Sequence, residues 1–196
     1  MTNMAEADFW RWFVANEQSL RRCSGEVVAD RVEKRLQEVD SRLGVEVSHE
    51  ANEHELIVTA GGDPEAFPTA RELVSKAPKL RHWAISALKP PRGFKFQMSL
   101  DGTTVEADQL LFEPLQSASH PQSLGIRLVL PGALQASAAQ LHEVAHLIIE
   151  TGIGEELAAY VDHVDVATTS VELSTGLPIS DLAKYITWHL KDRASK

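Results

Sequence analysis

The stretch VEVSHEANEHELIVTA, residues 45–60, decides the fold class of this chain. Its outer parts, VEVSH (45–49) and ELIVTA (55–60), are apolar and rich in β-branched residues, whereas the EANEH segment (50–54) between them is polar. Two such arms around a short polar segment are typical of a β-hairpin. Strands joined by hairpins pair antiparallel, so this stretch predicts a mainly antiparallel sheet that needs helices to cover it.

Two helices are expected before the hairpin. ADFWRWFVANEQSLRR (7–22) has a broad apolar face, which either docks on the core or contacts a partner. The residues of that face are Phe9, Trp10, Trp12, Phe13 and Leu20. SGEVVADRVEKRLQEVDSRLG (24–44) has apolar residues three or four apart, as a helix with one buried face requires. We expect Ser24 to cap its start and Gly44 to end it.

Helices and strands are also expected to mix after the hairpin. A helix after the GGDP turn should carry Pro68 in its first turn or start after it. A further hairpin is expected around Asp101 and Gly102, and a C-terminal helix with Ser180 as its cap. The other expected elements are a strand at 81–88, a strand at 124–132, a helix at 134–151 and an extended segment at 161–173.

This order predicts an α+β fold, in which a mainly antiparallel sheet is covered by helices and an N-terminal helical pair precedes the sheet. The length of 196 residues fits one domain, and the sequence shows neither an internal repeat nor a linker. We therefore expect a single domain over residues 1–196, with the helical pair of residues 1–44 packed on it.

The charge balance excludes some classes of function. Asp and Glu outnumber Lys and Arg by 28 to 19, and no basic run offsets the net charge of −9, so we expect no nucleic-acid partner. The single cysteine, Cys23, forms no internal disulfide, which fits a reducing cytoplasm. The acidic N-terminus is unlike a signal peptide, and no segment approaches the roughly 20 apolar residues of a membrane span. We expect a cytoplasmic protein without a membrane partner.

The segment LHEVAHLI (141–148) contains His-Glu-x-x-His, a signature of zinc-dependent hydrolases. His142 and His146 are four residues apart, so both would project from one face of the expected helix as zinc ligands. Glu143 stands where such an enzyme has its general base. A second interpretation is that the two histidines lie at the edge of an ordinary amphipathic helix. The apolar stripe of that helix would be Leu134, Ala138, Leu141, Ala145 and Ile148.

A third zinc ligand is missing from the sequence pattern. A catalytic zinc ion normally takes three protein ligands. The metzincin pattern would need a glycine and a histidine at positions that hold Ile149 and Gly152. Glu155 and Glu156 follow His146 too closely, because the rest of the helix carries the chain away from the histidines. We therefore assign no catalytic or metal-binding residue and expect no cofactor.

Four segments resemble an uncharacterised family of bacterial proteins, a conserved domain of unknown function. They are DFWRWFVANEQ (8–18), ELIVTAGGDPEAFPTARELVSKAPKLRHWAI (55–85), ADQLLFEP (107–114) and LIIETGIGEELAAYVDHVDV (147–166), and they span most of the chain in matching order. The family pattern does not include His-Glu-x-x-His before the segment that resembles LIIETGIGE. The resemblance therefore implies that His142 and His146 are incidental, and it implies no activity, cofactor or ligand.

The sequence thus favours a non-enzymatic protein that binds another protein, because no complete catalytic set is present. The alternative is a zinc-dependent hydrolase with His142 and His146 as ligands and Glu143 as general base. Two features of the sequence could contact a partner. Trp83 is either a core anchor or the wall of a groove, and the LKPPRG loop (88–93) carries Lys89 and Arg92 toward an anionic partner.

Overall fold

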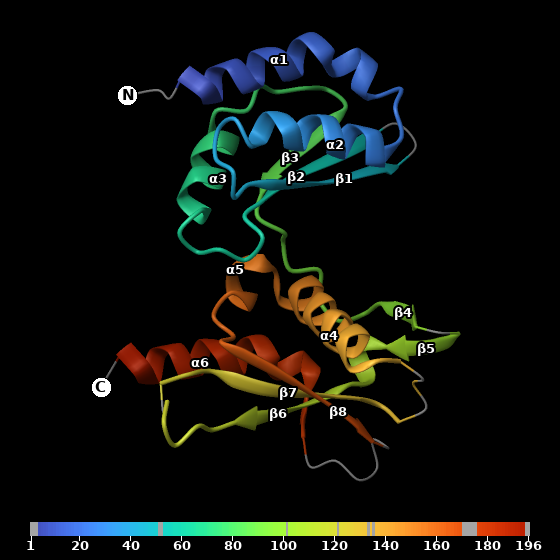
Figure 1. Ribbon diagram of the computed structural model, residues 1–196, viewed down its shortest axis with the longest axis vertical. Helices are drawn as coiled ribbons and strands as arrows, with labels where there is room; N and C mark the ends of the chain where they lie inside the picture. The colour runs from blue at the N-terminus through green and yellow to red at the C-terminus, as the bar shows by residue number, and fades with distance from the viewer. Residues whose placement is uncertain are drawn as a thin grey trace. The chain divides into compact units, whose positions relative to one another are not determined.

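Figure 1 shows the computed structural model of the chain, which describes residues 4–50, 53–100, 102–120, 122–132, 134, 136–169 and 176–194. The chain forms two compact units, Met1–Lys89 and Pro90–Lys196. Each unit has a sheet and helices of its own, a division that the sequence had not indicated. That the whole chain folds as one domain over residues 1–196 stays a prediction.

The first unit is built on the predicted hairpin. Its sheet consists of β1 (Gly44–Glu50), β2 (Glu53–Thr59) and β3 (Trp83–Ala87), in that order. β1 and β2 pair antiparallel, so the hairpin prediction is confirmed, and their register places His49 opposite His54. β3 pairs parallel to β2, because α3 (Phe67–Ser75) carries the chain back before β3 begins.

The N-terminal helical pair, α1 (Met4–Leu20) and α2 (Gly25–Leu36), is present as predicted. Both helices lie on the same side of the sheet in Figure 1. α2 buries Val28, Val32 and Leu36 completely, and α1 reaches β3 through an edge-to-face contact of 5.1 Å between the ring centroids of Phe13 and Trp83. These contacts fix one face of the sheet against the helices.

The predicted end of the second helix was wrong. α2 ends at Leu36, and Gly44 is the first residue of β1. The side chain of Asp40 accepts a hydrogen bond of 3.0 Å from the backbone N–H of Arg42. An aspartate that bonds the backbone two residues ahead forms a turn, and this turn takes the place of the last expected turns of helix.

The second unit has a four-stranded sheet in the order β8-β7-β6-β9 and a separate β4-β5 hairpin. The strands are β4 (Gln97–Leu100), β5 (Thr103–Glu106), β6 (Leu111–Leu115), β7 (Gly125–Pro131), β8 (His163–Thr169) and β9 (Leu177–Pro178). The expected hairpin at Gly102 is confirmed by the pairing of β4 with β5. Antiparallel pairs outnumber parallel pairs in the three sheets, so the α+β prediction is confirmed.

The helices of the second unit are α4 (Ala138–Ile153), α5 (Glu155–Ala158) and α6 (Leu182–Ala194). α4 starts later than predicted because Ser137 and Gln140 form a capping box. The prediction of Ser180 as a helix cap was wrong, since Ser180 lies inside a 3-10 turn, η3 (Ile179–Asp181). α4 and α6 pack on one face of the sheet, where the shared core includes Phe112, Ile126 and Ile148.

The two units repeat one topology. In each, a hairpin (β1-β2 or β6-β7) is followed by a helix and then by a strand that pairs parallel to the second hairpin strand. The third strands, β3 and β8, therefore form an edge of their sheets. Among the helices of the described residues, none combines the length and apolar character that a membrane crossing requires.

Candidate functional site

The His-Glu-x-x-His segment lies on α4, as predicted. Ala145 and Ile148 of this helix are buried in the core, His142 is half-buried, and Glu143 and His146 are exposed. This pattern is that of an amphipathic helix with the two histidines beside its buried face. Among the residues that the structure describes, no group of three or more His, Cys, Asp or Glu side chains could hold a metal ion.

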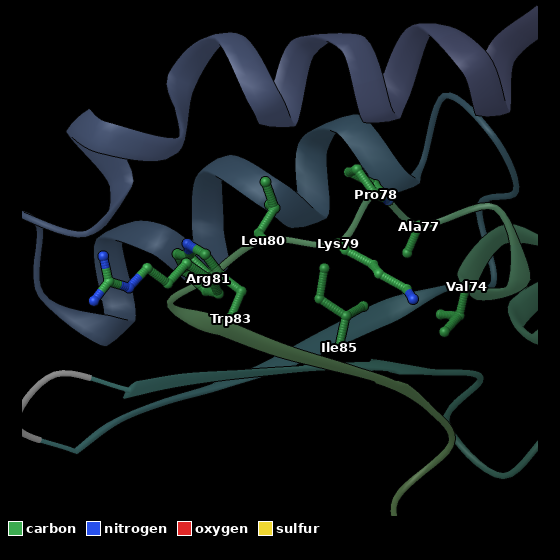
Figure 2. Close-up of a pocket in the computed structure, with 8 residues that line it drawn as sticks. All are labelled: Val74, Ala77, Pro78, Lys79, Leu80, Arg81, Trp83 and Ile85. Atoms are coloured by element: carbon green, nitrogen blue, oxygen red, sulfur yellow. The ribbon is translucent and has the colours of Figure 1, made fainter.

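A different feature, a surface hollow beside β3, gathers groups that can recognise a partner (Figure 2). We call it the β3 hollow. It has a volume of about 540 Å³ and opens widely to solvent. Its lining residues come from the end of α3, from the segment 76–82 that returns to β3, and from β3 itself. They are Val74, Ala77, Pro78, Lys79, Leu80, Arg81, Trp83 and Ile85.

The shape of the hollow follows from the return segment. The backbone N–H of Ala77 donates to Val74 O at 2.9 Å, and the N–H of Trp83 donates to Leu80 O at 3.3 Å. These turns hold residues 76–82 close to the chain on either side of them. Figure 2 shows Ile85 pointing from β3 toward this segment, and the amine of Lys79 lying between Ile85 and Val74.

The floor of the hollow is the edge of the core. Trp83 and Ile85 stand on the same face of the sheet as the buried Leu56, because the register pairs Leu56 with Ile85 and His54 with Trp83. Trp83 is 7% exposed and packs against Phe13 and His54 at centroid distances of 5.1 and 4.9 Å. Trp83 is therefore a core anchor whose remaining surface lines the hollow, so both sequence interpretations of this residue hold.

Two cations of the return segment line this hollow. Lys79 and Arg81 are both exposed, and neither is paired with a carboxylate of the described part of the chain. Neighbouring cations differ: Lys76 contacts Glu6 and Glu72, and Lys89 contacts Glu46 at 2.7 Å. In a chain with a net charge of −9, the rim of this hollow is thus a local positive site.

The second unit has hollows of comparable size, but the cation there is already neutralised. Arg127 lines a hollow of about 450 Å³, and its Nε donates to Asp165 Oδ2 at 2.8 Å. This hydrogen bond raises the pKa of Arg127 and lowers the pKa of Asp165. Glu113 contacts Arg127 from the other side at 3.4 Å. The three side chains form a cross-strand ion network on the sheet, which leaves little charge for a ligand.

Another hollow of the second unit, about 640 Å³, lies between α6 and the loop that joins β6 to β7. Tyr185, Trp188 and His189 line it, and Trp188 is 61% exposed. The only carboxylate among its lining residues is Asp192, and no Lys or Arg lines it. The lining of this hollow is aromatic but has no Lys or Arg, so it specifies the charge of a ligand less clearly than the lining of the β3 hollow does.

No binding residue was predicted from the sequence, and Lys89 and Arg92 were the cations expected to face an anionic partner. The structure places Lys89 in an ion pair with Glu46, and the backbone of Arg92 bonds Thr151 O at 2.9 Å. The signal that was missed is the segment KAPKLRH, residues 76–82. It carries three cations and no acid within an acidic chain, which indicates a local positive surface.

Comparison of the chain with protein-family models, with curated proteins and with solved structures gave no match. The resemblance to an uncharacterised bacterial family therefore stays a prediction, and the candidate function rests on the geometry of the β3 hollow.

Proposed function

We propose that this protein is a non-enzymatic interaction protein whose β3 hollow binds an acidic segment of another protein. The observation that carries the proposal is the pair of exposed cations, Lys79 and Arg81, which have no carboxylate partner in the described residues and line the same hollow as a partly exposed apolar surface. A carboxylate of a partner can pair with these cations without displacing an existing ion pair.

The chemistry of the lining supports binding rather than catalysis at this place. The lining residues include no His, Cys, Asp, Glu, Ser, Thr or Tyr side chain. General acid–base catalysis needs a group that gains and loses a proton near neutral pH, and covalent catalysis needs an activated nucleophile. Val74, Leu80, Trp83 and Ile85 instead offer apolar surface, which is the usual centre of a protein contact.

The open form of the hollow supports a chain segment as its occupant. Small-molecule sites are concave and bury most of the ligand, whereas the β3 hollow lies open along its outer side. An acidic peptide can place apolar side chains on the floor and carboxylates at the rim. Because the rim cations are exposed, the interaction should weaken as salt screens the charges.

The test uses a fluorescein-labelled peptide of Glu-Glu-Val-Val repeats, which presents both glutamate and valine on each face of an extended chain, with a Lys-Lys-Val-Val peptide of equal length for comparison. Fluorescence anisotropy with the full chain should show binding of the acidic peptide alone. The double variant Lys79→Glu/Arg81→Glu should weaken that binding by roughly tenfold or more, which corresponds to about 1.4 kcal/mol or more. Higher salt should also lower the affinity of the acidic peptide for the wild-type chain.

A matched control reverses two other exposed cations, Arg22→Glu and Lys95→Glu, which have no carboxylate partner in the described chain and do not line the hollow. This control changes the net charge by the same amount. It should leave the dissociation constant within about twofold of the wild type, because neither Arg22 nor Lys95 lines the hollow. Equal weakening in both double variants would show a general charge effect and would contradict a site at the β3 hollow.

A further inference from the structure

β3 offers main-chain groups to a partner as well as side chains. It is the edge strand of its sheet, with β2 on one side and no strand of the described residues on the other. Edge strands present unpaired N–H and C=O groups, and such an edge is a template for an added strand. The β3 hollow adjoins this strand, since Trp83 and Ile85 belong to both.

The hydrogen bonds of β3 show which of its groups point outward. His82 O accepts from His54 N–H at 2.9 Å, and Leu88 N–H donates to Val58 O at 2.8 Å. Both bonds join β2 through even-numbered residues. Successive residues of a strand direct their main-chain groups to opposite sides. The odd-numbered residues Trp83, Ile85 and Ala87 therefore direct theirs toward the free edge.

Trp83 already uses its N–H group, which donates to Leu80 O in the return segment. Ile85 and Ala87 have no main-chain partner on this side among the described residues. The N–H and C=O groups of two alternating residues are what an incoming strand pairs with. They stand immediately beside the apolar floor and the rim cations.

We infer that the acidic partner segment binds as an added β-strand, which pairs with the free main-chain groups of Ile85 and Ala87. The inference rests on the proposed function and specifies how the partner is held. Alternate side chains of an extended segment point to one face, so every second residue of the segment faces the β3 hollow. Main-chain pairing supplies affinity, and the floor and cations select apolar and acidic side chains.

The test changes the main chain of the probe and leaves the protein unaltered. Two versions of the glutamate–valine peptide carry N-methyl groups on alternate residues, one version in each phase. An added strand uses the N–H groups of only one phase, so one version should bind roughly tenfold or more weakly and the other within about threefold of the unmethylated peptide. Equal affinities of the two versions would overturn the inference.

A protein-side variant gives a second measurement. Proline at an edge position is tolerated when its lost N–H faced solvent, so Ala87→Pro should keep a melting temperature close to that of the wild type and weaken the peptide tenfold or more. Ser86→Pro removes a group on the β2 side and should lower the melting temperature. Unchanged peptide binding by a folded Ala87→Pro variant would contradict strand addition.

The two proposals fail in different ways. If the unmethylated acidic peptide does not bind, or if Lys79→Glu/Arg81→Glu binds it as the wild type does, the proposed function fails and strand addition fails with it. If the peptide binds, is weakened by the charge reversal, and shows no difference between the two N-methylated versions, only strand addition fails.

Discussion

The ring of Phe94 packs directly on Gly152 in the last turn of α4, where a Cβ atom at position 152 would overlap the ring. The main chain just before Phe94 also bonds the end of α4: Gly93 N–H donates to Gly152 O at 3.1 Å, and Arg92 N–H donates to Thr151 O at 2.9 Å. Glycine at 152 thus lets the segment that precedes β4 lie against a helix end. Contact with the Phe94 ring thus explains why a glycine stands at position 152 in the segment TGIGEE (151–156).

Gly152→Ala should destabilise the protein. The added methyl group must displace a buried ring, and overpacking of this kind costs about 1–3 kcal/mol. The higher helix propensity of alanine offsets about 1 kcal/mol at most. Urea unfolding should therefore show a lower free energy of unfolding. In a Phe94→Ala background, where the ring is gone, the same change should cost nothing or stabilise the chain. An equal loss in both backgrounds would contradict the contact.

Trp10→Phe should loosen the docking of α1. The Nε1 of Trp10 donates a buried hydrogen bond of 2.8 Å to Leu73 O in α3. Loss of this bond and the smaller ring should together lower the free energy of unfolding by about 1–3 kcal/mol. Trp12→Phe is the matched control, because Trp12 is half-buried and its ring meets the exposed Arg35 at 5.5 Å. We expect it to cost about 1 kcal/mol or less, and denaturant unfolding of both variants checks the difference.

Periodicity in the sequence was sufficient to identify most helices and strands. The apolar arms within residues 45–60 form β1 and β2 as predicted. The three- and four-residue spacing of apolar side chains from Val28 to Leu36 correctly predicted the helix α2. The boundaries failed where a side chain bonds the backbone. The bond from Arg42 N–H to Asp40 forms a turn where helix was expected after Leu36, and Ser137 set the start of α4 through its capping box. Such bonds depend on local geometry, which periodicity does not encode.

The pairing of elements was harder to predict than their existence. The parallel pairings of β2 with β3 and of β7 with β8 join strands that a helix separates, and an apolar run does not reveal its neighbour. The two compact units and their shared topology were missed for that reason. The β3 hollow was missed likewise, because Val74, Lys79 and Ile85 come together only after α3, the return segment and β3 have packed.

The stability of the first unit should depend on pH through Asp40. The guanidinium of Arg42 donates to both carboxylate oxygens of Asp40, at 3.0 and 2.7 Å, and its backbone N–H adds a third bond. These bonds lower the pKa of Asp40 from 3.8 to about 2. Because the folded pKa is the lower one, the stabilisation is present above the unfolded pKa and is lost as the pH falls through the folded pKa.

The difference in free energy of unfolding between the wild type and Asp40→Asn should thus be constant above a pH of about 4 and should shrink as the pH falls toward about 2. Urea unfolding over this pH range measures it. In an Arg42→Gln background the guanidinium is absent, so the same comparison should show a smaller change with pH. A difference that is independent of pH in the wild-type background would contradict the assigned cause.

The two histidines of α4 should not hold a catalytic zinc ion. His142 is half-buried, His146 is exposed, and no third His, Cys, Asp or Glu joins them to form a metal-binding group in the described part of the chain. A catalytic zinc site normally has three protein ligands. Wild-type protein purified without a chelator should therefore contain zinc well below one ion per chain by elemental analysis. His146→Ala should not change that content.

His163→Ala is the control for adventitious binding, since His163 is exposed and lies on β8 rather than on α4. Equal, substoichiometric zinc in the wild type and in both variants fits an interaction protein. If the wild type holds one zinc ion per chain, and His146→Ala loses it while His163→Ala keeps it, the chain has the metal site that the hydrolase alternative requires. The hydrolase alternative with Glu143 as general base is then correct if the wild type hydrolyses a peptide substrate and Glu143→Gln abolishes that activity while the zinc stays bound.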